Sequence, residues 1–449
     1  MPSSLAAVLR SPIAVTGVAL TTAAGLLFVF LVGLQLVGLL QNPYAGIVVF
    51  VMVPAFFTLG LVLIPVGVWI DRRREKGGLA AAAWPRIDMN DPAIRRMTVF
   101  LLLATLVNLG IVSIASFGAV EYTTSQQFCG QVCHTVMEPE AVAHQAGLHS
   151  QVRCVVCHVG PGAGGFIEAK VGGIRRVVGA LTGRYEAPIP TPVRGLPDVT
   201  YTCETCHSQH DTGDRLRVIH EYASDEANTE TITTLRMHVG GPIGASGTGA
   251  GIHWHMNRAN TVEFVALDDQ REQIPYVRLS TPDGEVREYF AEGTTSDDVN
   301  GRPLRRMDCL DCHSRPAHSF AASPEREVDA ALGTGRIAAS IPFVRRESVR
   351  TLSAEYPSRD VALAEIARSM REALAGGGSP SEDVQRAIDA TQAIYRANVF
   401  PGMRVGWGTY VNQLGHVTST GCFRCHDDSH TTLEGTAIRQ DCELCHAFE

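Results

Sequence analysis

Cysteine and histidine recur together through the second part of this 449-residue sequence. Five times, two cysteines are separated by two residues and a histidine follows directly, which is the C-x-x-C-H pattern. This pattern attaches haem c, because the two thiols add to the haem vinyl groups and the histidine becomes the proximal iron ligand. The five motifs are Cys154, Cys157 and His158; Cys203, Cys206 and His207; Cys309, Cys312 and His313; Cys422, Cys425 and His426; and Cys442, Cys445 and His446.

One further motif, the first along the chain, is irregular. Cys129 and Cys133 are separated by three residues, and His134 follows. With this motif all twelve cysteines are used, so we expect six haem groups, or five if the irregular pair is unmodified. Disulfides would not explain a histidine after every second cysteine. Zinc is the stronger alternative, because the last two motifs have zinc-ribbon spacing, but four more motifs upstream favour haem.

Ten of the sixteen histidines lie outside the motifs and are candidates for the second axial position. Closeness to a motif selects four of them as candidate ligands. One of His253 or His255 is a further candidate. In a strand, the alternation of these two residues would put both on one face. The four selected by closeness are His149, His318, His416 and His430.

Met137 stands three residues after His134 and is a candidate axial ligand for the first haem. The alternative is a methionine that only fills space in an apolar core.

Three uncharged apolar runs lie in the first 120 residues, at 13–40, 45–70 and 97–120. Each is long enough to cross a bilayer, and the first is too long for a signal peptide. The loop at 71–96 is basic, so we expect it in the cytoplasm together with the N-terminus. The haem-binding part then lies in the periplasm of a bacterium, anchored to the inner membrane.

Charge divides the chain at the same point. Residues 1–120 carry 8 Lys and Arg against 4 Asp and Glu, a net charge of +4, whereas the remainder carries 30 against 42, a net charge of −12. The acidic part favours a basic protein partner or is simply a solvated surface, and no nucleic-acid partner is expected.

Three further regions follow the membrane part. Residues 121–210 hold the first three motifs in loops, with a short helix over Phe166–Leu181. Residues 211–305 lack cysteine and read as a β insertion with a Pro-Asp-Gly turn. Residues 306–449 hold the last three motifs and a helical segment. The expected fold is therefore a membrane-anchored α-helical N-terminus of three transmembrane helices (1–120), plus a loop-rich multihaem cytochrome c domain.

Three segments within residues 97–210 resemble the NapC/NirT family, including its NrfH-like members: FCGQVCHTVMEPE, LHSQVRCVVCHVGPGAGGFIEAKVGGIRR and PIPTP followed by YTCETCH. The resemblance implies a quinol dehydrogenase that takes electrons from menaquinol or ubiquinol and passes them to periplasmic proteins. It also implies that the first haem is nearest the quinol, and that Met137 and Lys170 stand where the family has a methionine and a quinone-site lysine. The family usually has one membrane helix and four or five haems.

Later segments, among them GIHWH and MDCLDCHSRPAH, resemble larger three-helix relatives that relay electrons to periplasmic or extracellular acceptors. We therefore expect a quinol-oxidising inner-membrane cytochrome. Two alternatives stay open. One is a terminal reductase for nitrite, hydroxylamine or a sulfur oxyanion, which needs an open iron position. The other is an electron-transfer subunit of a larger membrane complex.

Overall fold

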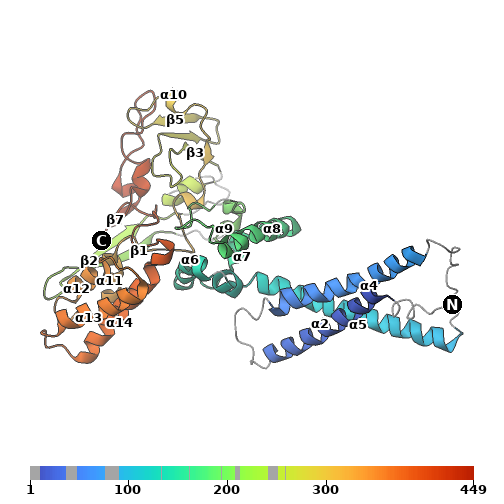
Figure 1. Ribbon diagram of the computed structural model, residues 1–449. Coiled ribbons are helices and arrows are strands. Elements are labelled where there is room, and N and C mark those ends of the chain that lie inside the picture. The colour runs from blue at the N-terminus through green and yellow to red at the C-terminus, as the bar shows by residue number, and fades with distance from the viewer. Residues whose placement is uncertain are drawn as a thin grey trace. The chain divides into compact units, whose positions relative to one another are not determined.

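The computed structural model describes most of the chain and divides it into two compact units, residues 1–132 and 133–449 (Figure 1). The described residues are 11–36, 48–75, 90–132, 134–160, 162–193, 195–207, 213–240, 251–257 and 259–449.

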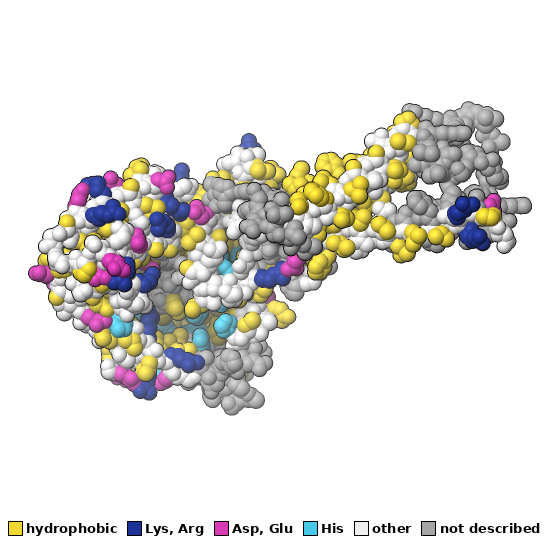
Figure 2. All heavy atoms as spheres, turned by 90° about the horizontal axis from the view of Figure 1, so that it is seen from below, with side chains coloured by type: hydrophobic (Ala, Val, Ile, Leu, Met, Phe, Trp, Pro, Cys, Tyr) yellow, Lys and Arg dark blue, Asp and Glu magenta, His cyan; other side chains and the backbone are white. Residues whose placement is uncertain are grey.

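The first unit consists of helices long and apolar enough to cross a membrane. These are α2 (Pro12–Leu36), α4 (Val53–Glu75) with a preceding π-helical turn η1 (Val48–Met52), and α5 (Pro92–Thr123). The three predicted membrane helices are confirmed by this arrangement. Figure 2 shows hydrophobic side chains over the outward surface of this unit, as contact with lipid requires. Residues 37–47 lie outside the described residues, and so do residues 76–89, which form the middle of the basic loop.

Helices α2 and α4 approach each other closely at glycines. A Cβ atom placed on Gly17 would lie 2.8 Å from the carbonyl oxygen of Gly60, and one placed on Gly60 would lie 2.7 Å from the backbone nitrogen of Thr21. Small residues allow such backbone contact between membrane helices, where packing replaces the hydrophobic effect as the source of association. The glycines therefore fix the spacing of the two helices.

Gly60→Val is expected to push α2 away from α4, because overpacking of a helix contact costs about 1–3 kcal/mol. We expect less protein in the membrane fraction and a lower Tm in detergent. Gly33→Val is the matched control, since no atom lies within 4 Å of a Cβ placed there. Equal membrane levels and equal Tm for the two variants would contradict this packing.

In the second unit, short helical turns carry the regular motifs. Helix α6 (His134–Ala146) comes first, and α8 (Gly162–Leu181) occupies the range expected for a helix. The turns at the motifs are α7 (Cys154–His158), α9 (Val199–His207), η4 (Cys309–Asp311), η6 (Gly421–Arg424) and η7 (Cys442–Leu444).

Two antiparallel sheets lie between and beside the motifs. One has the order β1-β2-β7, with β1 at Arg215–Tyr222, β2 at Glu230–Met237 and β7 at His446–Phe448. The other has the order β5-β4-β3-β6, with β3 at Thr261–Val265, β4 at Tyr276–Ser280, β5 at Val286–Phe290 and β6 at Arg305–Arg306. Each sheet takes its last-named strand from a motif region, because β7 begins at His446 and β6 precedes Cys309.

A helical bundle provides the largest apolar core of the second unit. It contains α11 (Pro324–Gly333), α12 (Val344–Leu352), α13 (Arg359–Leu374) and α14 (Ser381–Asn398). Its buried side chains include Ile366, Met370, Ile388 and Tyr395, and Tyr222 of β1 joins them. The bundle thus supports the sheet that ends in the last motif. Single turns α10 (Ser296–Val299), η3 (Ile252–Met256) and η5 (Pro401–Met403) complete the described elements of this unit.

Candidate functional site

Each regular motif forms one helical turn. His313 donates its backbone N–H to the carbonyl oxygen of Cys309 at 2.8 Å, and His426 does the same to Cys422 at 3.1 Å. Residues three apart in a turn lie on one side of it, so the two thiols of a motif face the same direction. This is the arrangement that attachment to two vinyl groups of one porphyrin requires.

The histidines of the five regular motifs, which are the predicted proximal ligands, each face a histidine from outside the motifs. The distances between ring centres are 6.1 Å for His158 and His318, 6.1 Å for His207 and His149, 6.3 Å for His313 and His253, 5.8 Å for His426 and His255, and 6.2 Å for His446 and His416.

These separations match the space that one iron needs between two imidazoles. A metal-bound histidine nitrogen lies about 2 Å from the metal. The ring centre lies about 1 Å further away, as ordinary bond lengths dictate, so two ligands of one metal have ring centres about 6 Å apart. The residues therefore fit a haem iron with two histidine ligands at five motifs. A further histidine, His144, has its ring centre 5.8 Å from that of His318. Its Nε2, however, lies 3.0 Å from the Val152 carbonyl oxygen, so this nitrogen already has a hydrogen-bond partner.

Backbone carbonyls orient several of these rings. The Nδ1 atom lies 3.0 Å from the Pro316 oxygen in His149, 2.9 Å from the Glu140 oxygen in His318 and 2.8 Å from the Ile252 oxygen in His255. A metal-binding histidine commonly donates its other N–H to such an acceptor, which fixes the ring and its tautomer. Nε2 is then left to face the partner ring.

Burial favours the neutral form of four of the paired rings. Burial is the largest cause that lowers the pKa of His158, His255, His313 and His318 below the ordinary histidine value. A neutral imidazole keeps the lone pair that a metal ligand needs, whereas a protonated ring has none. Burial thus favours the form of these four rings that can bind a metal.

The predicted strand at His253 and His255 is wrong. The structure has a 3₁₀ turn, η3, in which the Trp254 N–H donates to the carbonyl oxygen of Gly251 at 3.0 Å. A 3₁₀ turn has three residues per turn, so residues two apart point in different directions. The two histidines consequently face two different proximal partners, where the sequence led us to expect only one ligand from this segment.

The structure does not bring His430 to a motif histidine. Its Nδ1 lies 2.9 Å from an Asp427 carboxylate oxygen and its Nε2 lies 2.7 Å from the Ile274 oxygen. The residue is only 2% exposed, and both ring nitrogens are occupied. Its ring therefore binds the segment just before β4 instead of facing a motif histidine. Its nearness to His426 in sequence was a misleading signal.

The thiols of successive motifs come close together. Cys203 and Cys309 share a side-chain hydrogen bond. Burial, and next the Cys422 thiol, raise the pKa of Cys312 to about 11. Burial likewise raises the pKa of Cys445, with Cys422 as the next contributor. Helices α7 and α9 are also in contact. The second to sixth motifs thus follow one another in space as they do in sequence.

The alternatives to haem need other arrangements of these cysteines. Eleven cysteines are described, and each is free of a disulfide. Within the described parts of the chain, no group of three or more histidine, cysteine, aspartate or glutamate side chains is placed to hold a metal ion, which a zinc site requires.

A hollow of about 690 Å³, its open mouth included, surrounds the last pair. His416, His446, Cys442 and Cys445 line it, and the Phe423 ring stacks on His416 with ring centres 4.4 Å apart. An aromatic wall and two thiols beside two facing imidazoles are the donors and surfaces that a haem group needs.

The irregular first motif is described only in part. A π-helical turn, η2 (Phe128–Val132), begins one residue before Cys129. A π turn closes one residue later than an α turn, so it takes up one extra residue. Cys133 and the His134 side chain lie outside the described residues. Met137 is half-buried on α6.

Helix α8 exposes an apolar stripe. Ile167, Val171, Ile174 and Leu181 are all more than 60% exposed and recur at helical spacing. Lys170 lies on the same helix, with its Nζ 5.1 Å from the centre of the Phe166 ring. A helix with an exposed apolar stripe and basic residues suits the surface of a membrane.

The facing rings predict which histidines keep a haem low-spin. His253→Ala is expected to give one high-spin ferric haem in the electron paramagnetic resonance spectrum, because a five-coordinate iron has a weaker ligand field. His430→Ala is the matched control, and we expect all haems in it to stay low-spin. A high-spin haem in the His430 variant only, or in neither variant, would contradict the pairing.

Comparisons with known proteins agree with this architecture. The N-terminal region of the NapC/NirT cytochrome c family matches residues 92–189, from α5 past α8. The cytochrome c-type protein ImcH of Geobacter sulfurreducens is 38% identical over 448 residues, which cover 98% of this chain and 88% of that protein. No solved structure matches the chain. The chain belongs to the NapC/NirT cytochrome c family, and it is a membrane-anchored multihaem cytochrome that carries covalently bound haem c and transfers electrons.

Proposed function

We propose that this cytochrome oxidises a quinol, menaquinol or ubiquinol, at the outer face of the bacterial inner membrane and passes the electrons to a periplasmic or extracellular acceptor protein. The observation that carries the relay is the set of five imidazole pairs whose motifs follow one another in space. When bound, haem c supplies the one-electron iron couple at each motif.

We assign the second axial ligands from the facing rings. His318 serves the motif of His158, and His149 serves the motif of His207. His149 stands next to the second motif and serves the third, whereas His318 stands next to the fourth motif and serves the second, so in each case a short segment links two different motifs. The other three assignments are His253 for His313, His255 for His426 and His416 for His446.

Two histidines at each of these five motifs leave no coordination position for a substrate. This supports an electron relay over a terminal reductase, which needs an open iron position. It also gives the protein its task, which is to hold the rings at a fixed separation while electrons pass, with little movement of the chain.

Quinol is proposed to bind near α8 and the first motif. The apolar stripe of α8 supports a position at the membrane surface, where quinol is dissolved. Lys170 supplies a cation close to that surface, suited to contact a quinol oxygen. Met137 is the proposed axial ligand of the first haem, and a methionine ligand raises the potential of an iron that accepts electrons.

The positive charge of the loop at 71–96 supports a cytoplasmic position for that loop and a periplasmic position for the second unit.

Electrons are proposed to leave at the sixth motif. Cys442 is exposed there, Phe448 is 76% exposed and Leu444 is 43% exposed. Apolar side chains beside an exposed haem edge suit brief contact with a soluble protein.

A reduced menaquinol analogue, added without oxygen to the detergent-solubilised protein, is expected to reduce the haem absorbance rapidly in stopped flow, and a quinol-site inhibitor should block this. Lys170→Met should slow reduction by quinol by about tenfold, the scale of one lost charged hydrogen bond. Reduction by dithionite should be unchanged.

Arg368→Gln, on the exposed face of α13, is the control for loss of one positive charge. If quinol fails to reduce the unsubstituted protein while dithionite succeeds, the protein is not a quinol dehydrogenase by itself. Restoration of quinol oxidation by a second membrane protein would identify it as a subunit of a larger complex.

The number of haems is proposed to be six. Intact mass spectrometry should give the chain with six haem groups, because the π turn at Phe128–Val132 takes up the extra residue of the first motif. Replacing Cys129 and Cys133 together by serine should remove one haem and leave five. A mass with five haems before substitution would show that the first motif is unmodified.

A further inference from the structure

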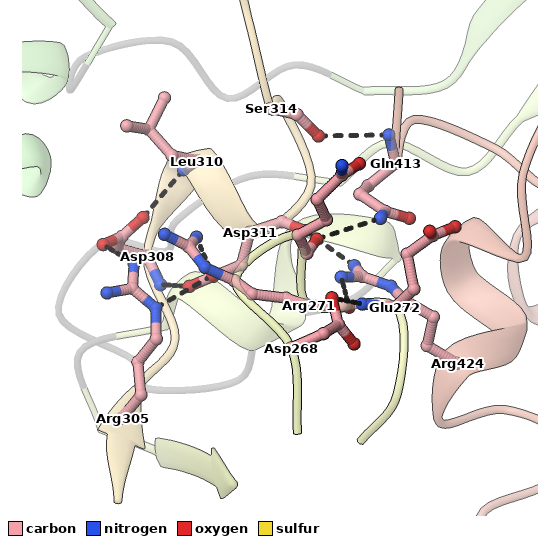
Figure 3. Close-up of polar contacts among 11 residues, drawn as sticks. Asp268, Arg271, Glu272, Arg305, Asp308, Leu310, Asp311, Ser314, Gln413 and Arg424 are labelled. Carbon is pink, nitrogen blue, oxygen red and sulfur yellow. Dashed lines mark hydrogen bonds and ion pairs between the residues drawn. The ribbon is translucent and has the colours of Figure 1, made fainter. Parts of the chain in front are cut away.

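A buried carboxylate lies inside the fourth motif. Asp311 stands between Cys309 and Cys312, and its side chain is 1% exposed. The Arg305 Nε donates to it at 3.0 Å, and Arg271 donates to the same oxygen (Figure 3). A buried charge is costly unless it is paired, and these two guanidinium groups supply the pairing.

An arginine of the fifth motif joins the same cluster. Arg424 stands between Cys422 and Cys425, and its Nη2 donates to the Asp311 carbonyl oxygen at 2.6 Å. Its Nη1 donates to the Arg271 carbonyl oxygen at 2.8 Å. One side chain therefore connects the fourth motif, the fifth motif and the loop between β3 and β4 (Figure 3).

The same two motifs are also connected on their distal side. His253 faces His313 of the fourth motif, and His255 faces His426 of the fifth. Both belong to the single turn η3, so the chain joins these two sites on two opposite sides of the iron positions. Covalent continuity through three residues leaves little room for independent movement.

Charged groups of both signs lie around these two motifs. The cluster has three guanidinium groups, from Arg271, Arg305 and Arg424, and two carboxylates, from Asp308 and Asp311, and the carboxylates of Asp268 and Glu272 lie on the loop of Arg271 (Figure 3). Reduction adds an electron to a site, and a nearby positive charge stabilises the added electron. The low dielectric of a buried site strengthens this effect.

We propose that Asp311 and Arg424 are positioning residues that lock the fourth and fifth haem sites into one rigid pair, and that the surrounding arginines raise the midpoint potentials of that pair. This deepens the proposed relay and depends on haem binding at these motifs, but it does not depend on quinol as the electron donor.

A purely structural role is the competing explanation. Asp308 accepts from the Leu310 N–H at 2.8 Å, and Asp311 accepts from the Asp308 N–H at 2.7 Å, so both carboxylates also cap the motif turn. Loss of a cap would disturb the turn whatever the sign of the charge removed. Only an effect on potential that follows the sign of the charge distinguishes the two roles.

The test is a redox titration of the full-length, haem-loaded protein in detergent, followed by visible absorbance, with haem content checked by intact mass. Arg424→Gln should lower the midpoint of one or two transitions and leave the others in place. Asp311→Asn should raise a midpoint in the same part of the titration. At a fixed potential the ratio of reduced to oxidised haem should change by about tenfold for each variant.

Three further variants complete the design. Arg305→Gln removes the same charge from a residue that is 36% exposed, so it tests the proposal if Arg424→Gln loses haem. Arg424→Lys keeps the charge and should leave the midpoints close to those of the unsubstituted protein. Arg287→Gln, in an exposed pair with Glu285 on the same sheet, is the control and should change nothing.

Midpoints that move in the same direction for Asp311→Asn and Arg305→Gln, or that stay unchanged with full haem content, would overturn the proposal. Chemical titration needs no quinol, so this outcome is independent of whether quinol reduces the protein. A protein that quinol does not reduce, but that shows the opposite shifts, would retain the locked pair and lose only the proposed donor.

Discussion

Facing imidazole rings about 6 Å apart are the constraint on which the second unit depends. Such spacing tolerates little error, because a metal–nitrogen bond holds only over a few tenths of an ångström. The surrounding elements are short turns and two small sheets, and the bundle of α11 to α14 supplies the main apolar core. Together these elements place the ten imidazole rings of the five facing pairs. The regular structure is thus a frame for positions that a bound group completes.

Buried polar contacts hold that frame where apolar side chains are few. Glu140 on α6 binds Arg315 at 2.6 Å, and its carbonyl oxygen accepts from His318. Arg315 also lies over the Tyr410 ring, 3.9 Å from its centre. The His318 ring is thereby fixed by its own segment together with two distant ones, those of Glu140 and Tyr410. Charge pairs of this kind are costly to bury but give a defined geometry, which is what a ligand ring requires.

The sequence predicted the parts of the site that are local. A C-x-x-C-H motif fits within one turn, so five consecutive residues are enough to identify a haem attachment site. The long apolar runs at the N-terminus likewise identify the membrane helices. Pairings across the chain were harder. Closeness to a motif selected His149, His318 and His416, which do face proximal rings, but it also selected His430, whose nitrogens both bind the protein.

Alternation suggested a strand at His253 where Gly251, with a φ of +74°, starts a 3₁₀ turn. Strands β1 and β2 lie within the predicted β insertion, but their partners were not predicted, because β1 lies against the helical bundle and β2 pairs with β7, more than 200 residues away. The Asp311 cluster gave no signal in the sequence, since its partners come from three separate segments.

Distances along the chain between facing rings have a consequence for how the protein matures. His158 and His318 are 160 residues apart, and His255 and His426 are 171 apart, whereas every covalent attachment uses one short motif. Closing a long loop is slower than forming a single turn. Attachment can therefore be complete while the second ligand is still absent. The folding chain must then pass through a stage in which the motif histidines are in place and the distant histidines that face them are not.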